Sequence, residues 1–300
     1  MHEILEARFL APNIKFFRVH AARVARTQRP GQFVMVRLHE RGERIPLTIE
    51  DADPASETIC LVVQAIGKTT RLMNRLEARD HLLDVVGPLG RPSDVRHFGR
   101  AVVVGGGVGC AIAYPTARAL AAAGNTVISI IGARNAELVL LESEIRAISG
   151  ETIVMTDDGS YGRKGFVTDP LAEMIAAGRR LDYVLAIGPV AMMKAVADTT
   201  REKAVRTVVS LNSIMVDGTG MCGGCRVIVG GARRFACVDG PEFDAHDVDF
   251  EVLARRNVFY RGQEKAALER FEVDPKGETE RVRESCASAA RQLEVSRLEP

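Results

Sequence analysis

The chain has 300 residues, of which 46% are hydrophobic, and a formal net charge of +1. This length and apolar content can support two packed domains and a small additional module, and the near-neutral charge gives no sign of a nucleic-acid partner. No apolar run reaches the roughly 18 residues of a membrane span, and the N-terminus lacks a signal-peptide pattern, so the sequence predicts a cytoplasmic protein without a membrane span.

Residues 1–97 are predicted to form an antiparallel β-barrel. Short apolar segments alternate with turn residues such as Pro30-Gly31 and Gly87-Pro88, which is typical of a small all-β domain. The expected strands are Ile4–Ala11, Ile14–Val19, Gln32–Leu38, Leu47–Glu50, Ile59–Ala65 and His81–Val86. One helix, Thr70–Glu77, is expected to interrupt them.

Two segments of this barrel have residue types that suit a phosphate group. Arg44-Ile45-Pro46-Leu47-Thr48 offers a cation, a rigid proline and a hydroxyl in succession, which would fit the phosphate and ring edge of a flavin. The same residues would also serve as the ordinary start of a strand. Gly67-Lys-Thr69-Thr70 places a glycine turn before a helix N-terminus, where backbone N–H groups can bind phosphate. Its alternative is a simple capped helix.

Residues 98–212 are predicted to form a doubly wound parallel α/β domain, because strands here alternate with helices. The expected strands are Ala101–Val104, Thr126–Ile131, Thr152–Met155, Tyr183–Ile187 and Thr207–Leu211. The expected helices are Ala111–Ala123, Ala136–Ile148, Leu171–Ala177 and Val190–Lys203.

A glycine-rich segment follows the first strand of this domain. Gly105-Gly106-Gly107-Val108-Gly109 departs from the strict G-x-G-x-x-G spacing, but it lies between a strand and a helix, where glycine lets a pyrophosphate approach the helix N-terminus. Other segments follow later strands and are expected at the same ligand-binding edge of the sheet. They are Arg134, whose positive charge would favour NADP through its 2′-phosphate, Asp157-Asp158-Gly159-Ser160, and Gly188-Pro189. Arg134 and the aspartates could equally be loop residues.

Residues 213–250 contain a cysteine motif. Asp217-Gly-Thr-Gly-Met-Cys222-Gly-Gly-Cys225 has the spacing of plant-type ferredoxins, with Asp217 at the first cysteine position, and Cys237 follows. Two short strands joined at Gly230-Gly231 are expected to form a hairpin that returns Cys237 to Cys225. Three thiolates and one carboxylate would then surround a small iron–sulfur cluster.

The alternative for this motif is a zinc site, because Cys-x2-Cys does not distinguish the two metals. Asp217 or His246 would be the fourth zinc ligand, and Asp244, Asp247 and Asp249 are also nearby in the sequence. The glycine run favours a cluster, since glycines let the backbone wrap closely and direct N–H groups at sulfur. The remaining residues, 251–300, are charged and predicted to be partly helical, as a solvated or partner-covering segment.

Taken in order, these motifs resemble those of the ferredoxin reductase-like superfamily, and more narrowly its FAD/NAD-binding electron-transfer subunits. The resemblance covers residues 1–260 and is most specific at Ser210–Cys225 and Phe235–His246. It includes the dihydroorotate dehydrogenase electron-transfer subunits and the small (alpha) subunits of NADH-dependent reduced ferredoxin:NADP oxidoreductases, also called sulfide dehydrogenase beta subunits. The former carry four cysteines, so Asp217 places the chain nearer to the latter.

The resemblance implies FAD on the barrel, NAD(H) rather than NADP on the α/β domain, and a [2Fe–2S] cluster in the cysteine module. The residues at matching positions are Ile45–Thr48, Gly67, Thr69 and Thr70 for FAD, Gly105–Gly109, Asp157–Ser160 and Gly188-Pro189 for NAD(H), and Asp217, Cys222, Cys225 and Cys237 for the cluster. It also implies that the flavin carries the chemistry, and that electrons pass to a larger iron–sulfur flavoprotein partner, with ferredoxin as another partner and electron bifurcation as an option.

Three alternatives stay open on the sequence alone. The chain could be the electron-transfer subunit of dihydroorotate dehydrogenase, or a stand-alone ferredoxin or flavodoxin:NAD(P)H reductase. The third alternative is a zinc-stabilised nucleotide-binding module without turnover.

Overall fold

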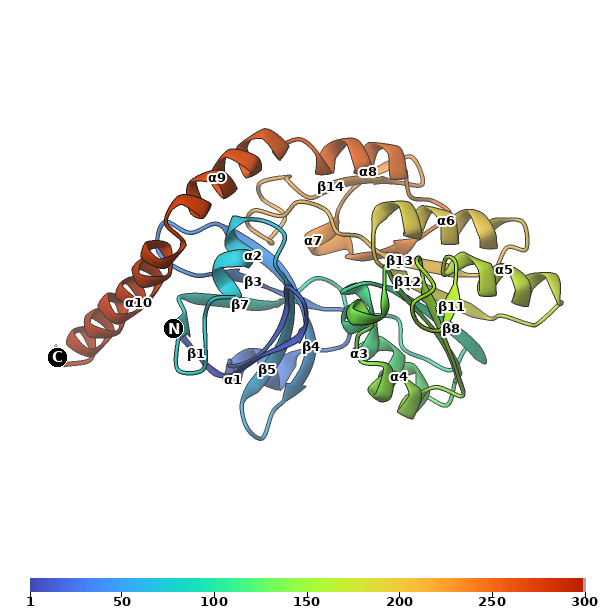
Figure 1. Ribbon diagram of the computed structural model, residues 1–300, viewed down its shortest axis with the longest axis horizontal. Coiled ribbons are helices and arrows are strands. Elements are labelled where there is room, and N and C mark those ends of the chain that lie inside the picture. The colour runs from blue at the N-terminus through green and yellow to red at the C-terminus, as the bar shows by residue number, and fades with distance from the viewer. Residues whose placement is uncertain (299–300) are drawn as a thin grey trace.

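The structure, a computed structural model, describes residues 1–298, with side chains up to residue 292. Figure 1 shows a barrel and an α/β domain side by side, with the last helices of the chain running along the outside of both. Within the described residues, no helix is both long and apolar enough to cross a bilayer.

The N-terminal domain is a seven-stranded antiparallel sheet that is nearly closed into a barrel. Its strand order is β6-β1-β2-β5-β4-β3-β7. The strands are β1 (His2–Ala11), β2 (Ile14–His20), β3 (Phe33–Arg37), β4 (Arg44–Asp53), β5 (Thr58–Gln64), β6 (His81–Leu82) and β7 (Asp84–Leu89). Two short helices, α1 (Ala22–Thr27) and α2 (Lys68–Met73), lie between strands. The inward-facing side chains, among them Phe17, Val34 and Leu61, form one buried core.

The second domain is a seven-stranded sheet in the order β11-β10-β9-β8-β12-β13-β16, parallel except at β16. Its strands are β8 (Arg100–Gly106), β9 (Thr126–Ala133), β10 (Glu151–Thr156), β11 (Arg163–Lys164), β12 (Tyr183–Ile187), β13 (Thr207–Ser210) and β16 (Glu242–Asp244). Its helices are α3 (Gly109–Ala122), the 3-10 helix η1 (Ala136–Leu138), α4 (Glu142–Ile148), α5 (Thr168–Ala176) and α6 (Val190–Arg201). The central strands are apolar along their whole length because helices cover both faces of the sheet.

The cysteine module contains a hairpin of β14 (Arg226–Val229) and β15 (Ala232–Phe235), followed by α7 (Ala236–Asp239). Val229 pairs with Ala232, so Gly230 and Gly231 alone form the turn, and both have positive φ, as this turn type requires. The described remainder of the chain consists of α8 (Phe250–Asn257), α9 (Arg261–Val273) and α10 (Pro275–Leu298).

The predicted fold class, a barrel followed by a parallel α/β domain and a cysteine module, is confirmed. Several local expectations were wrong. The helix expected over Ala136–Ile148 is divided into η1 and α4, because Leu141 between them adopts a left-handed conformation with φ of 52°. The helix expected at Thr70–Glu77 begins earlier, at Lys68, and ends earlier, at Met73. The short elements α1, β11 and β16 were not expected.

Candidate functional site

The candidate nucleotide site lies at the carboxyl ends of β8 and β12. The chain leaves β8 for β9 on one side and later returns to place β12 on the other, and such a switch in strand order opens a crevice for ligands. Gly109 begins α3 directly against β12, since a Cβ atom built there would be only 2.2 Å from the carbonyl oxygen of Ile187. Gly107 has φ of 57°, which lets the chain turn sharply from strand to helix.

A cavity of about 1040 Å³ extends from this edge of the sheet to the barrel. Its apolar walls come from both domains, as is typical of a cofactor site between domains. Among the residues predicted from the sequence, the cavity is lined by Pro46, Leu47, Thr48, Thr70, Gly106, Gly107, Val108, Gly109, Arg134, Asp157, Gly188 and Pro189. The two candidate flavin segments and the glycine-rich segment therefore face one volume.

Other predicted residues lie behind the wall of the cavity or beside it. They are Arg44, Ile45, Gly67, Thr69, Gly105, Asp158 and Gly159, none of which lines it. Asp158 accepts hydrogen bonds from the backbone N–H and hydroxyl of Ser160, and these bonds lower the pKa of its carboxyl. Asp158 thus shapes its own turn, while the neighbouring Asp157 lines the cavity.

The helix α2 is fixed at the edge of the cavity by its threonines. The Thr70 hydroxyl accepts hydrogen bonds from the N–H groups of Ile66 and Gly67, at 3.0 and 3.1 Å. The Thr69 hydroxyl points instead at the β3–β4 loop and donates to Glu43 Oε2 at 2.5 Å. Thr70 therefore helps to form the cavity wall, and Thr69 ties that wall to a second segment of the barrel.

Sequence reasoning missed several lining residues. On the barrel side these are Phe33, Val62, Val63, Gln64 and Ile66, and on the other side Gly132, Phe166, Asn212, Ser213 and Met215. Most belong to apolar strands or to loops that follow them, so their composition does not set them apart from core residues. Ile66 is 69% exposed beside the cavity, but this exposure belongs to the folded chain and was not visible in the sequence.

The hairpin brings Cys225 and Cys237 together as expected. Their sulfur atoms lie 3.2 Å apart, and both side chains are buried. Burial, and then the hydrogen bond between the two thiols, raise the pKa of Cys237 to about 12. A metal that binds these sulfurs must displace their protons, as thiolate ligation always requires.

Asp217 and Cys222 form a second pair on the same loop. The two Asp217 carboxylate oxygens accept hydrogen bonds from the backbone N–H groups of Thr219, at 3.0 Å, and Cys222, at 2.9 Å. Chiefly the bond from Thr219, together with those from Cys222, lowers the pKa of Asp217 against the opposing effect of burial. Gly218 and Gly220, with φ of 77° and 87°, give the loop the curvature that brings its amides to the carboxylate.

This arrangement of two close pairs fits a two-iron cluster better than a single metal ion. Among the side chains described, those of residues 1–292, no group of three or more His, Cys, Asp and Glu converges on one point closely enough to hold a metal. A mononuclear zinc site requires four ligands around one centre, whereas two pairs can serve two adjacent irons. His246, the alternative zinc ligand, lies within hydrogen-bonding distance of Thr200 on α6 instead, at 2.9 Å.

The cavity and the cysteine pair share a wall. Phe33 and Met215 line the cavity and also belong to the buried cluster that packs around Cys225 and Cys237. One packed cluster therefore joins the cavity to the cysteine pair, so a ligand in the cavity and a metal on the cysteines would be neighbours.

The fold and this pair of sites define a class: an oxidoreductase subunit with the architecture of ferredoxin reductases and an additional iron–sulfur module. Two family models agree with it. Residues 103–198 match the oxidoreductase NAD-binding domain, and residues 212–249 match the iron–sulfur cluster binding domain of dihydroorotate dehydrogenase B.

Similarity to individual proteins shows to which family within this class the chain belongs. The dihydroorotate dehydrogenase B (NAD(+)) electron transfer subunit homolog of Thermotoga maritima is 46% identical over 280 residues, which cover 93% of this chain and 98% of that protein. The dihydroorotate dehydrogenase B electron transfer subunit of Geobacillus thermodenitrificans is 35% identical and covers 82% of this chain, with 96% of its own length matched. The chain therefore belongs to the family of dihydroorotate dehydrogenase B electron transfer subunits and their homologues.

Solved structures agree. A chain of a structure described as giving insight into flavin-based electron bifurcation in NADH-dependent reduced ferredoxin-NADP oxidoreductase has a TM-score of 0.86 and 46% identity, covering 90% of this chain and 98% of that one. Phthalate dioxygenase reductase shares the fold, with a TM-score of 0.53 and 16% identity.

Proposed function

We propose that this protein is an electron-transfer flavoprotein subunit that passes electrons between NAD(H), FAD and a [2Fe–2S] cluster, and onward to a larger iron–sulfur flavoprotein partner, as an NADH-dependent reduced ferredoxin:NADP oxidoreductase does. The observation that carries this proposal is the wall formed by Phe33 and Met215, which separates the interdomain cavity from the buried cysteine pair. A nucleotide-binding module without turnover has no need for such adjacency.

Each part of the chain has its own role in this proposal. The barrel, residues 1–97, would hold FAD against Pro46, Leu47, Thr48 and Thr70, with Arg44, Ile45, Gly67 and Thr69 supporting that wall. The α/β domain, residues 98–212, would hold NAD(H) between the Gly105–Gly109 segment, Asp157–Gly159 and Gly188-Pro189. The module of residues 213–250 would hold the cluster on Asp217, Cys222, Cys225 and Cys237.

The protein residues in this scheme bind, orient and shield. The flavin supplies the chemistry when bound, because it accepts electrons in pairs and releases them singly. Gly106 and Gly188 let Met192 pack closely against this edge of the sheet, since a Cβ atom at Gly106 would lie 2.4 Å and one at Gly188 2.7 Å from its side chain. The apolar residues of the cavity exclude water from the route between the two centres.

The cytoplasm is the location that suits this chemistry. The six cysteines of the chain are all free thiols, and the close pair Cys225 and Cys237 is not joined as a disulfide. A reducing compartment keeps such thiols available for metal.

A second candidate is the electron-transfer subunit of dihydroorotate dehydrogenase, which the match to the Geobacillus thermodenitrificans subunit favours. The partner distinguishes the two. Orotate-dependent oxidation of NADH with a dihydroorotate dehydrogenase catalytic subunit would support this second candidate and would contradict the first.

The deciding experiment for the redox function is a visible absorption spectrum of anaerobically purified protein, before and after NADH. Flavin bands together with broad sulfur-to-iron absorption, both bleached by NADH, are the expected result. A colourless protein that contains one zinc ion per chain would contradict the proposal.

A further inference from the structure

The last two helices, α9 and α10, are placed against the outer face of α2. Figure 1 shows them running past α2 and along the barrel, far in sequence from the strands they cover. Neither family model includes them, because the matched residues end at 249. We use the name tail clamp for these two helices, Arg261–Leu298.

The tail clamp contributes apolar side chains to the core of the barrel. Phe271 of α9 and Val282 and Cys286 of α10 are each at most 5% exposed, and they belong to the same buried cluster as Leu72 of α2 and Leu76 just after it. Burial of this kind is expected only where a segment is part of the folded domain, since a merely solvated helix would keep its apolar side chains few and exposed. The expectation of a solvated or partner-covering segment is therefore wrong for these two helices.

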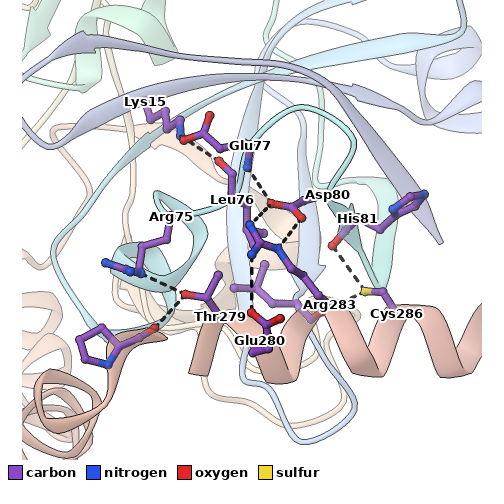
Figure 2. A network of polar contacts seen from close by, with 12 residues as sticks. Lys15, Arg75, Leu76, Glu77, Asp80, His81, Thr279, Glu280, Arg283 and Cys286 are labelled. Carbon is purple, nitrogen blue, oxygen red and sulfur yellow. Dashed lines mark hydrogen bonds and ion pairs between the residues drawn. The ribbon is translucent and has the colours of Figure 1, made fainter. Parts of the chain in front are cut away.

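Polar contacts of the tail clamp follow one side of α2 and the turn after it. Lys68 and Arg71 are three residues apart, which places them on one side of the helix, and Arg75 lies two residues beyond the end of α2. Their partners all come from the tail clamp: Glu278 to Lys68 at 3.5 Å, Glu272 to Arg71 at 2.7 Å, and the Thr279 hydroxyl to Arg75 Nε at 3.0 Å. Figure 2 shows the last of these.

The turn that follows α2 is fixed from inside the barrel, and the tail clamp joins that network too. Lys15, only 1% exposed, donates to the carbonyl oxygen of Leu76 at 2.8 Å and to Glu77 Oε1 at 2.7 Å. Asp80 accepts from the backbone N–H of Glu77 and from Arg283 of α10, at 2.9 and 2.8 Å. Figure 2 shows Arg283 reaching from α10 to Asp80 beside this turn.

The tail clamp also contacts the loop between β3 and β4, which leads into the cavity wall. The hydroxyl of Ser285 accepts a hydrogen bond from the N–H of Glu40 at 3.3 Å, in the loop between β3 and β4. That loop continues to Glu43, which accepts from Thr69 of α2, and then to Pro46, Leu47 and Thr48 of the cavity wall. One pair of helices thus holds both barrel segments that meet at the candidate flavin site.

From these contacts we infer that Glu272, Thr279 and Arg283 of the tail clamp are positioning residues, which hold α2 and the turn after it in the arrangement that binds the flavin. This inference rests on the proposed FAD site. None of the three residues lines the cavity, and the residues to which they hydrogen-bond, Arg71, Arg75 and Asp80, do not line it either, so they act on the flavin through α2 and the turn that follows it.

The test compares two full-length variants with the parent protein. The first, Glu272→Ala/Thr279→Val/Arg283→Ala, removes the polar contacts but keeps the buried apolar side chains. The matched control, Lys265→Ala/Glu269→Ala, removes an exposed ion pair that stays within α9. Two quantities are measured: the dissociation constant of FAD, by quenching of flavin fluorescence, and hydrogen exchange of residues 66–77 in the absence of FAD.

Each exposed polar contact of this kind shifts an equilibrium about 1.5- to fivefold. The triple variant is therefore expected to bind FAD about tenfold more weakly and to exchange its α2 amides faster, while the control matches the parent in both. The exchanged pair Arg71→Glu/Glu272→Arg is expected to bind FAD more tightly than Glu272→Arg alone, which guards against a variant that is merely misfolded.

Two results overturn the inference, and they differ from each other. An unchanged FAD dissociation constant in the triple variant, with a parent protein that binds FAD, refutes the positioning role and leaves the proposed function standing. A parent protein that binds no FAD refutes the flavin site itself, and the positioning role with it.

Discussion

The protein is expected to lose stability as the pH rises from 4.5 to 7, and replacing Glu242 with glutamine is expected to prevent about half of that loss. Glu242 begins β16 and accepts a hydrogen bond at 2.6 Å from Ser93, whose hydroxyl is also 2.9 Å from that of Thr116. The three residues come from β16, the segment after β7, and α3. Burial, and to a lesser degree the charge of Asp94, raise the pKa of Glu242 to about 7 against the opposing effect of Ser93.

The magnitude follows from the difference in proton affinity between the folded and unfolded chain. With a pKa of about 7 when folded and about 4.5 when unfolded, the folded protein binds more protons, so its stability falls as the pH rises through this window. The loss is about 3 kcal/mol, at about 1.36 kcal/mol for each tenfold change. Glu50, whose pKa is raised to about 7 chiefly by burial, contributes a similar loss. Glutamine at 242 can still accept from Ser93 but carries no charge.

The assay is the thermal midpoint of the parent, Glu242→Gln and Glu50→Gln proteins at pH 5 and pH 8. For a chain of this size about 3 kcal/mol corresponds to about 5 °C, so Glu242→Gln should melt about 5 °C above the parent at pH 8 and close to it at pH 5. Glu50→Gln should behave in the same way, and the double variant should lose most of the pH dependence. If Glu242→Gln retains the full dependence of the parent, Glu242 is already ionised at neutral pH and the reasoning is refuted.

Three further predictions concern the two sites. Cys225→Ala should abolish the iron–sulfur absorption and iron content but leave flavin binding intact, and a variant that retains iron would contradict the assignment of this ligand. Asp217→Cys should raise the midpoint potential of the cluster, because an oxygen ligand favours ferric iron more than a thiolate does, and an unchanged potential in a redox titration would exclude Asp217 as a ligand. Gly109→Ala should weaken NADH binding at least tenfold by calorimetry, since its Cβ would lie 2.2 Å from the Ile187 oxygen and force α3 away from β12. Gly262→Ala, where a Cβ meets no atom within 4 Å, is the control and should bind NADH normally.

The sequence predicted those features that depend on local chemistry. The Gly230-Gly231 turn defines its own hairpin, so the meeting of Cys225 and Cys237 could be foreseen from their nearly equal sequence distances to it. The alternation of strands and helices likewise predicted the parallel sheet, and with it the glycine-rich segment at a sheet edge.

Features that depend on tertiary packing could not be predicted from the sequence. Val62 and Val63 read as core strand residues, and only the approach of the α/β domain makes them part of a cavity. The helix expected over Ala136–Ile148 is divided at Leu141, and no glycine or proline in that segment indicates the break. The apolar residues of α9 and α10 are too sparse among charges to indicate that they complete a barrel whose strands lie some two hundred residues earlier.

The burial of Phe271, Val282 and Cys286 in the barrel has a consequence for biosynthesis. Domains generally fold during synthesis from the N-terminus onward, each as its residues become available. This barrel begins at residue 2, yet Cys286 hydrogen-bonds to the carbonyl oxygens of Leu38 and His81, so its core stays incomplete until the end of the chain has been made. The α/β domain, whose strands and helices are contiguous in sequence apart from β16, can fold first. The first domain to leave the ribosome is therefore the last to be finished, and a chain that lacks its final helices will carry a folded nucleotide domain beside an open barrel.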